Sequence, residues 1–182
     1  FKELEGIHSR TDFDLKSHQQ YSKRKIKYFD SELNKSYIPY VIETSIGLDR
    51  MFLAIMCNSY KEEEINDNEK RIVLSIPQFL APIKLAILPL TKKDGLSEKA
   101  KKIFNDLKLE FNCCYEEKDS IGKRYRRQDA IGTPFCLTID HQTLEDDTCT
   151  LRYRDKMNQK RVKIKEVSEI IDKEVNLKNF IV

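Results

Sequence analysis

The sequence predicts an α/β fold in which a mixed five-stranded sheet is flanked by helices. Short apolar-rich segments recur at 83–90, 111–117 and 135–140, and the segments between them carry apolar residues at helical spacing. An alternating stretch, 148–165, is typical of a hairpin and precedes a further helical stripe. This order of elements indicates a sheet with both parallel and antiparallel neighbours.

The first strand, IKLAILPL (83–90), is almost wholly apolar, as expected of a strand that is covered on both faces. The helix predicted after it, 96–110, has an apolar stripe formed by Leu96, Ala100, Ile103, Phe104 and Leu107. FNCCYEE (111–117) is predicted as the second strand, and FCLTID (135–140) as the third.

The remaining elements follow from turn and capping signals. DSIGKRYRRQDAIG (119–132) is predicted to be a short basic helix that ends at Gly132. The hairpin of 148–165 turns near 155–158, and Val167, Ile170 and Ile171 form the apolar stripe of a closing helix.

Three zones are expected along the chain. Residues 1–57 form part of a first domain, and residues 81–182 form the α/β domain. Between them, 58–80 begins with NSYKEEEINDNEK, which has seven charges in thirteen residues and no apolar periodicity. That composition predicts a solvated connector.

Composition excludes some classes of protein. Hydrophobic residues make up 40% of the 182 residues, enough for a core, and no apolar run approaches the roughly 20 residues that span a bilayer. The net charge of +3 does not by itself indicate a nucleic-acid partner. The five cysteines form no C-x-x-C pair, which favours reduced thiols in a cytoplasmic protein without a structural metal. The start at Phe1 favours an internal piece of a longer protein.

The stretch YIPYVIETSIGLDRMFLAIM (37–56) predicts a strand over 37–42, a turn at Gly47 and a helix over 48–56. Glu43 and Ser45 would then lie near the carboxyl end of the strand. Arg50 lies off the apolar stripe and in the first helical turn, where the helix dipole disfavours a cation. It is either a surface arginine in a salt bridge or a ligand for an anion or a flat ring.

A second cluster is basic. Within 120–128, four cations surround one aromatic ring and suit phosphate contacts and base stacking: Lys123, Arg124, Tyr125, Arg126 and Arg127. In the hairpin, Arg152 and Arg154 share one strand face and Lys163 and Lys165 share a face of the next strand. The alternate residues are expected in the core: Leu151, Tyr153, Val162 and Ile164. For both groups the alternative is a solvated polar face.

Four polar residues near the start of the chain, His8, Asp12, Asp14 and His18, could form a metal or acid–base cluster. Their spacing fits no closed metal site, so we interpret them as a polar loop and helix start that support a neighbouring site.

YIPYVIETSIGLDR resembles motif 3 of the class II aminoacyl-tRNA synthetases, in the form found in dimeric glycyl-tRNA synthetases. ELEGIHSRTDFDL (3–15) resembles the segment that precedes motif 3 in that family. Three further blocks resemble the family in the same order: APIKLAILPL, IGKRYRRQDAIGTPFCLTID and TLRYRDKMNQKRVKI. The resemblance covers nearly the whole chain and is weakest over 16–36 and 58–80.

The resemblance implies a role for each matching residue. Arg50 would pack on the adenine of ATP, and Glu43 would lie near the ATP phosphates and Mg²⁺. Ser45 and Glu3 would bind the glycine substrate, with Glu3 at its ammonium group. The implied fold is the end of the antiparallel-sheet catalytic domain followed by an anticodon-binding domain at 81–182, whose contacts would be with tRNA(Gly).

The implied activity of the parent protein is ATP- and Mg²⁺-dependent attachment of glycine to tRNA by a homodimer, without a membrane or DNA partner. Motifs 1 and 2 of the family are absent from this chain, so it is expected not to aminoacylate alone. One alternative is a non-catalytic RNA-binding module or accessory subunit on a synthetase-like fold. Another is a threonyl, prolyl or histidyl synthetase, against which the E-T-S and E-L-E-G-I segments argue.

Overall fold

The computed structural model describes residues 3–66 and 69–181 and divides the chain into two compact units, 1–54 (unit 1) and 55–182 (unit 2). The boundary lies within helix α2. None of the helices in the described ranges is long and apolar enough to cross a lipid bilayer.

Unit 1 is built on an antiparallel ribbon of two strands, β1 and β4. A short helix and a small hairpin lie between these strands in the sequence, and α2 follows β4. The elements are β1 (Glu5–Thr11), α1 (Phe13–Ser22), β2 (Tyr28–Asp30), β3 (Lys35–Tyr37), β4 (Val41–Ile46) and α2 (Leu48–Ser59).

The predicted helix over 48–56 is confirmed, but the strand predicted over 37–42 begins and ends four residues later. Pro39 has no backbone N–H to donate to a ladder, so regular pairing starts only after it. Glu43 and Ser45 therefore lie within β4, with Ser45 one residue before its carboxyl end.

Unit 2 contains the mixed five-stranded sheet that the sequence predicts. The strands lie in the order β11-β10-β9-β7-β8, with β7 parallel to both β8 and β9 and β10 antiparallel to both β9 and β11. The strands are β5 (Tyr60–Asn66), β6 (Glu69–Leu74), β7 (Leu85–Pro89), β8 (Cys113–Tyr115), β9 (Phe135–Ile139), β10 (Thr148–Tyr153) and β11 (Gln159–Lys163). The α-helices are α3 (Leu96–Leu107), α4 (Ile121–Ile131), α5 (His141–Asp146) and α6 (Val167–Val175), with 3-10 turns at Gln78–Leu80, Ile164–Glu166 and Leu177–Asn179.

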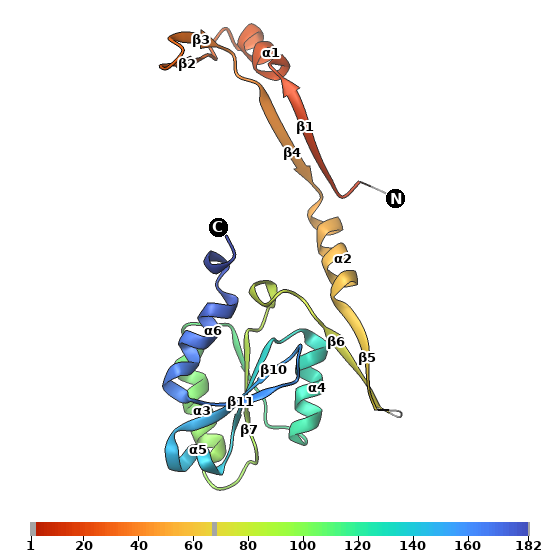
Figure 1. The fold of residues 1–182 in the computed structure, drawn as a ribbon, viewed down its shortest axis with the longest axis vertical. Helices are drawn as coiled ribbons and strands as arrows, with labels where there is room; N and C mark the ends of the chain where they lie inside the picture. The colour runs from red at the N-terminus through yellow and green to blue at the C-terminus, as the bar shows by residue number, and fades with distance from the viewer. Residues whose placement is uncertain (1–2, 67–68, 182) are drawn as a thin grey trace. The chain divides into compact units, whose positions relative to one another are not determined.

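Helices cover both faces of this sheet. α3 and α6 pack on one face and enclose the main core with Leu85, Leu137 and Leu151. α4 packs on the other face against Ala86, Leu88 and Cys136; Figure 1 shows α3 and α4 on opposite sides of the strands. All five residues of β7 and all five of β9 are buried, which is why these segments read as apolar runs.

The connector prediction is wrong for residues 60–66 and 69–74, which form the antiparallel hairpin β5–β6. β6 packs against α4 and buries Arg71 and Val73, while Ile72 between them stays half exposed. A charged residue on the inward face hides the period-2 pattern, so the strand does not appear in a hydrophobicity profile. The domain boundaries at 57 and 81 stay predictions.

Candidate functional site

One face of the β1–β4 ribbon is polar. In the ladder Gly6 lies opposite Ser45 and His8 lies opposite Glu43. Directly opposed residues of an antiparallel pair project to the same side, so all four share one face. Arg10 reaches the same side, where its Nε lies 3.4 Å from a carboxylate oxygen of Glu43. The pairing thus joins the upstream segment to the motif 3 strand and groups the predicted Glu43 and Ser45.

Gly6 is set close to an imidazole ring. A Cβ built at Gly6 would lie 2.4 Å from His8 Nε2 and 3.2 Å from its Cε1. Any larger residue would have to displace the His8 ring, which lies over the position opposite Ser45. The close approach means that a larger residue fits at this position only with a different His8 rotamer.

Arg50 contacts the lead-in to β1. Its guanidinium donates a hydrogen bond to the backbone carbonyl of Glu3, a neutral acceptor, and its side chain is exposed. This bond joins the first turn of α2 to the segment before Gly6. All four residues predicted to bind glycine or ATP therefore lie on the ribbon or at its junction with α2: Glu3, Glu43, Ser45 and Arg50.

The histidine and aspartate group near the start of the chain does not converge on one point. Asp12 pairs with Lys16 at 2.6 Å, and Asp14 pairs with Arg10 at 2.9 Å. Within residues 3–66 and 69–181, no three His, Cys, Asp or Glu side chains are arranged to hold a metal ion. Arg10, which sequence reasoning missed, connects this group to Glu43; its place two residues after His8 in β1 is the signal that could have revealed it.

The basic helix α4 differs from its prediction at Arg124. This side chain is 2% exposed, and its guanidinium donates to the carbonyl oxygens of Pro89 (2.6 Å), Leu90 (3.2 Å) and Glu116 (3.2 Å). Burial lowers its pKa, and the nearby Glu116 partly offsets that effect. Because a buried guanidinium cannot reach a phosphate in solution, the prediction of a tRNA contact has to be corrected for Arg124.

The other members of the basic run have separate environments. Tyr125 is half-buried, with its hydroxyl 2.5 Å from Thr138 Oγ1 and the Arg152 guanidinium 4.7 Å from its ring centroid. That ring face is occupied by Arg152, so base stacking on it is not supported. Arg127 is half-buried and pairs with Asp119 at 2.9 Å, whereas Lys123 and Arg126 are exposed. Lys123, Arg126 and Arg127 remain predicted tRNA contacts.

A buried ion-pair network centres on Asp129, which is 1% exposed. Arg152 of β10 donates to both of its carboxylate oxygens, at 2.7 and 2.9 Å, and Arg71 of β6 donates to one at 2.9 Å. Burial lowers the pKa of Arg152, but the bonds to Asp129 outweigh this and leave the pKa raised. The network fixes the β5–β6 hairpin and the end of β10 to α4.

Of the two interpretations of the hairpin cations, RNA contacts or a solvated polar face, neither holds on β10. Arg152 and Arg154 are 5% and 2% exposed, and Arg154 donates to the carbonyls of Gly132 and Ile76. They do share a face, as predicted, but α4 and the segment after β6 cover it. Lys163 and Lys165 are exposed, and β11 ends at Lys163, before the predicted strand does. Of the predicted core residues, Leu151 and Val162 are buried and Tyr153 and Ile164 are partly buried.

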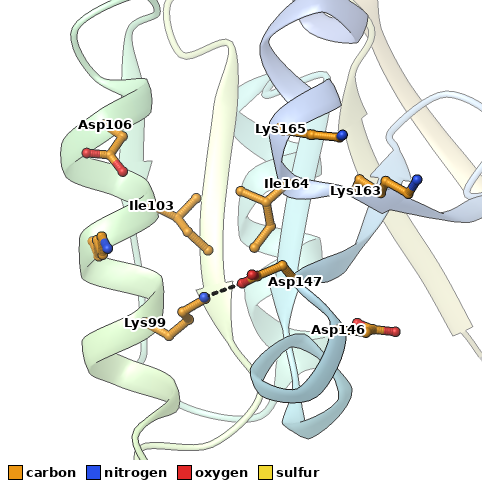
Figure 2. A pocket seen from close by; sticks show the side chains of 9 residues that line it. Lys99, Ile103, Asp106, Asp146, Asp147, Lys163, Ile164 and Lys165 are labelled. Atoms are coloured by element: carbon orange, nitrogen blue, oxygen red, sulfur yellow. Dashed lines mark hydrogen bonds and ion pairs between the residues drawn. The ribbon is translucent and has the colours of Figure 1, made fainter.

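A pocket of about 530 Å³ lies on the α3 side of unit 2, between α3, the α5–β10 turn and the end of β11. Ile103 and Ile164 form its apolar part, and lysines and aspartates surround them, with Lys99 paired to Asp147 at 2.5 Å (Figure 2). The lining therefore contains charges of both signs.

The mixed five-stranded sheet and its flanking helices give unit 2 the anticodon-binding fold of class II aminoacyl-tRNA synthetases. A structure of the RNA-binding domain of threonyl-tRNA synthetase from Cryptosporidium parvum Iowa II superposes with a TM-score of 0.68 and 19% identity. The superposition covers 95% of this chain and 39% of that one, and it establishes the fold. A model of the family described as "Anticodon binding domain" matches residues 84–174, and the chain belongs to this family.

Curated relatives extend the similarity through unit 1. The chain is 51% identical over 170 residues to a glycine–tRNA ligase of Chlorobaculum tepidum, which covers 93% of the chain and 36% of that protein. It is 49% identical over 185 residues to a glycine–tRNA ligase of Treponema denticola, covering 99% of the chain and 41% of that protein. The predicted resemblance to the glycyl-tRNA synthetase family is confirmed, and the chain spans about two fifths or less of these relatives.

Proposed function

We propose that this chain is the part of a cytoplasmic glycine–tRNA ligase that carries motif 3 and the anticodon-binding domain. The observation that carries the proposal is the joint match: unit 2 has the anticodon-binding fold, and near 50% identity extends through the polar ribbon of unit 1. In the homodimeric ligase, unit 2 binds the anticodon of tRNA(Gly), and the ribbon face contributes to the glycine and ATP sites.

The chemistry of the ribbon supports the glycine and ATP assignments. A glycine substrate offers no side chain, so selection has to use its ammonium group and exclude larger residues. The carboxylate of Glu43 and the hydroxyl of Ser45 suit ammonium and metal–phosphate ligands. Arg50 is exposed beside the ribbon, where a guanidinium can stack on a flat ring.

The ATP-bound Mg²⁺ needs few protein ligands, because phosphate oxygens and water complete its shell. The Glu43 carboxylate, already at 3.4 Å from Arg10, fits one such position. Glu43 would help to hold the ion, which would supply charge neutralisation at the phosphates, and Arg10 would keep the Glu43 carboxylate in place.

The test measures two properties of this chain. Titration with a tRNA(Gly) transcript is expected to show binding that weakens when the anticodon bases are substituted and when salt is raised. Glycine-dependent ATP–pyrophosphate exchange by the chain alone is expected to be undetectable, because the residues of motifs 1 and 2 are not in this sequence. Equal binding to an anticodon-substituted transcript would contradict the RNA assignment, and measurable exchange would contradict the incomplete site.

An accessory, non-catalytic RNA-binding module is the second candidate function. It is distinguished by substituting Glu43 with Gln in the longer ligase. Loss of charging activity without loss of tRNA binding supports the enzyme, and tRNA binding without any charging by the unaltered longer protein supports the module.

A further inference from the structure

The carboxyl ends of β7 and β8 form a topological switch point. The two strands are parallel neighbours, but the chain leaves β7 for α3 on one face of the sheet and leaves β8 for α4 on the other (Figure 1). Connections that diverge in this way open a crevice at the carboxyl ends of the strands, the usual place for a ligand in an open α/β sheet.

In this protein a side chain occupies that position. Arg124, from the first turn of α4, donates to the carbonyls of Pro89, the last residue of β7, and of Leu90, which follows it. It also donates to the carbonyl of Glu116 just after β8. Arginine is the side chain whose fan of N–H donors can satisfy several carbonyls in a plane. Its Nε is buried and has no hydrogen-bond partner among the described residues.

The carbonyls bonded to Arg124 lie where two exposed loops begin. The loop 90–95 carries Lys92 and Lys93, and the loop 116–120 carries Lys118, all of them exposed. A second arginine of α4, Arg127, fastens the latter loop by donating to Lys118 O at 2.8 Å and pairing with Asp119. Arg124 and Arg127 of α4 therefore fix the loops that present the lysines.

We propose that Arg124 is a positioning residue for RNA binding. It holds the β7–α3 and β8–α4 loops at one spacing, so that Lys92, Lys93 and Lys118 act together on the phosphates of a single-stranded RNA loop. The proposal rests on the tRNA-binding function proposed above. Arg124 touches no RNA itself; it lowers the ordering cost that two independent loops would incur on binding.

The experiment is a double-mutant cycle on the full chain, read by titration with the tRNA(Gly) transcript at about 50 to about 200 mM salt. Arg124→Met removes the donors and keeps similar bulk, and Lys92→Ala with Lys118→Ala removes one cation from each loop. Arg124→Met is expected to weaken binding about tenfold and to flatten the salt dependence, although a buried residue makes no phosphate contact. The lysine substitutions are expected to cost much less in the Arg124→Met background than in the unaltered chain.

The matched control is Lys163→Ala with Lys165→Ala, which removes two exposed cations from the α3-side pocket of Figure 2. These two substitutions are expected to change the affinity for tRNA by the same factor in the unaltered chain and in the Arg124→Met background. Should Arg124→Met fail to fold, Arg124→Lys takes its place in the cycle, because it keeps the charge but cannot bond to all three carbonyls. It is expected to show the same coupling between position 124 and the loop lysines.

Strict additivity between position 124 and the loop lysines would overturn the proposal, as would unchanged binding by a folded Arg124→Met chain. Failure of the unaltered chain to bind any tRNA would instead contradict the proposed function, so the two failures are distinguishable.

Discussion

Unit 2 has a core and unit 1 does not. From Val73 to Val175 unit 2 buries a continuous set of apolar residues on both faces of its sheet. Among the described residues of 3–54, no hydrophobic side chain is buried, and Gly6 is the only buried residue. Ile7, Ile42 and Ile46, on the opposite face of the ribbon from Glu43, are 69%, 66% and 51% exposed.

This difference separates the two parts of the proposed function. A two-stranded ribbon is marginally stable in water, so unit 1 needs further protein against its apolar face before its polar face can hold a fixed geometry. Unit 2 can hold its α4 surface by itself, because the core and the Asp129 network lie within it. RNA binding is expected to be a property of unit 2, and the glycine and ATP sites are expected to depend on a longer ligase.

The largest expected effect comes from Asp129→Ala in unit 2. Removing this carboxylate leaves the Arg152 guanidinium buried without its acidic partner and Arg71 with Glu63 alone, which is expected to cost about 3–5 kcal/mol of unfolding free energy. The matched control in unit 1 is Asp14→Ala, which breaks the exposed pair with Arg10 and should leave urea unfolding unchanged. Comparable losses in the two variants would contradict the difference between the units.

Core substitutions sharpen the same contrast. Leu151→Ala opens a cavity beneath α6 and is expected to cost about 2–5 kcal/mol, measured by urea unfolding of unit 2. Ile42→Ala, a similar truncation on the exposed ribbon face, should not lower the midpoint. A loss at Ile42 as large as that at Leu151 would mean that unit 1 buries a core in solution.

A smaller effect depends on pH. Burial alone would raise the pKa of Asp140, but bonds from Arg161 and Thr143 outweigh it and hold the pKa below 3.8. Because the folded-state pKa lies below the unfolded one, Asp140 stabilises unit 2 above about pH 4, and this contribution disappears as pH falls through the folded-state value.

Asp140→Asn keeps an oxygen to cap α5 but loses the charge. It is expected to be less stable than the unaltered chain at pH 7, with the gap in urea midpoint closing below about pH 4. A gap that stays constant across this range would show that the cap, and not the charge, carries the effect.

The parts of the fold that could be predicted from the sequence are those in which apolar periodicity and burial coincide. β7, α3 and β9 have an uninterrupted apolar pattern, and Gly132 ends α4 in a left-handed conformation with a φ of 86°. β6 could not be predicted, because a buried arginine occupies one of its inward positions. α5 was missed because six residues held by an Asp140–Thr143 capping box carry too little periodicity.

The candidate site divides in the same way. Family resemblance pointed to Glu43, Ser45 and Arg50; the ribbon register groups the first two, and a hydrogen bond to Glu3 connects Arg50 to the same ribbon. The basic run was misinterpreted at Arg124, because a sequence gives the charge of an arginine but not which backbone carbonyls it meets. The burial of Arg152 could not be predicted for the same reason: its partner Asp129 lies 23 positions away on another element.

Hydrogen exchange of the whole chain, followed by mass spectrometry, tests the central claim most directly. The backbone amides of β7, β9 and β10 are expected to exchange only through global unfolding of unit 2, and those of β1 and β4 to exchange orders of magnitude faster. Equal protection of the β1–β4 ribbon and the unit 2 sheet would contradict the claim that only unit 2 is held by its own core.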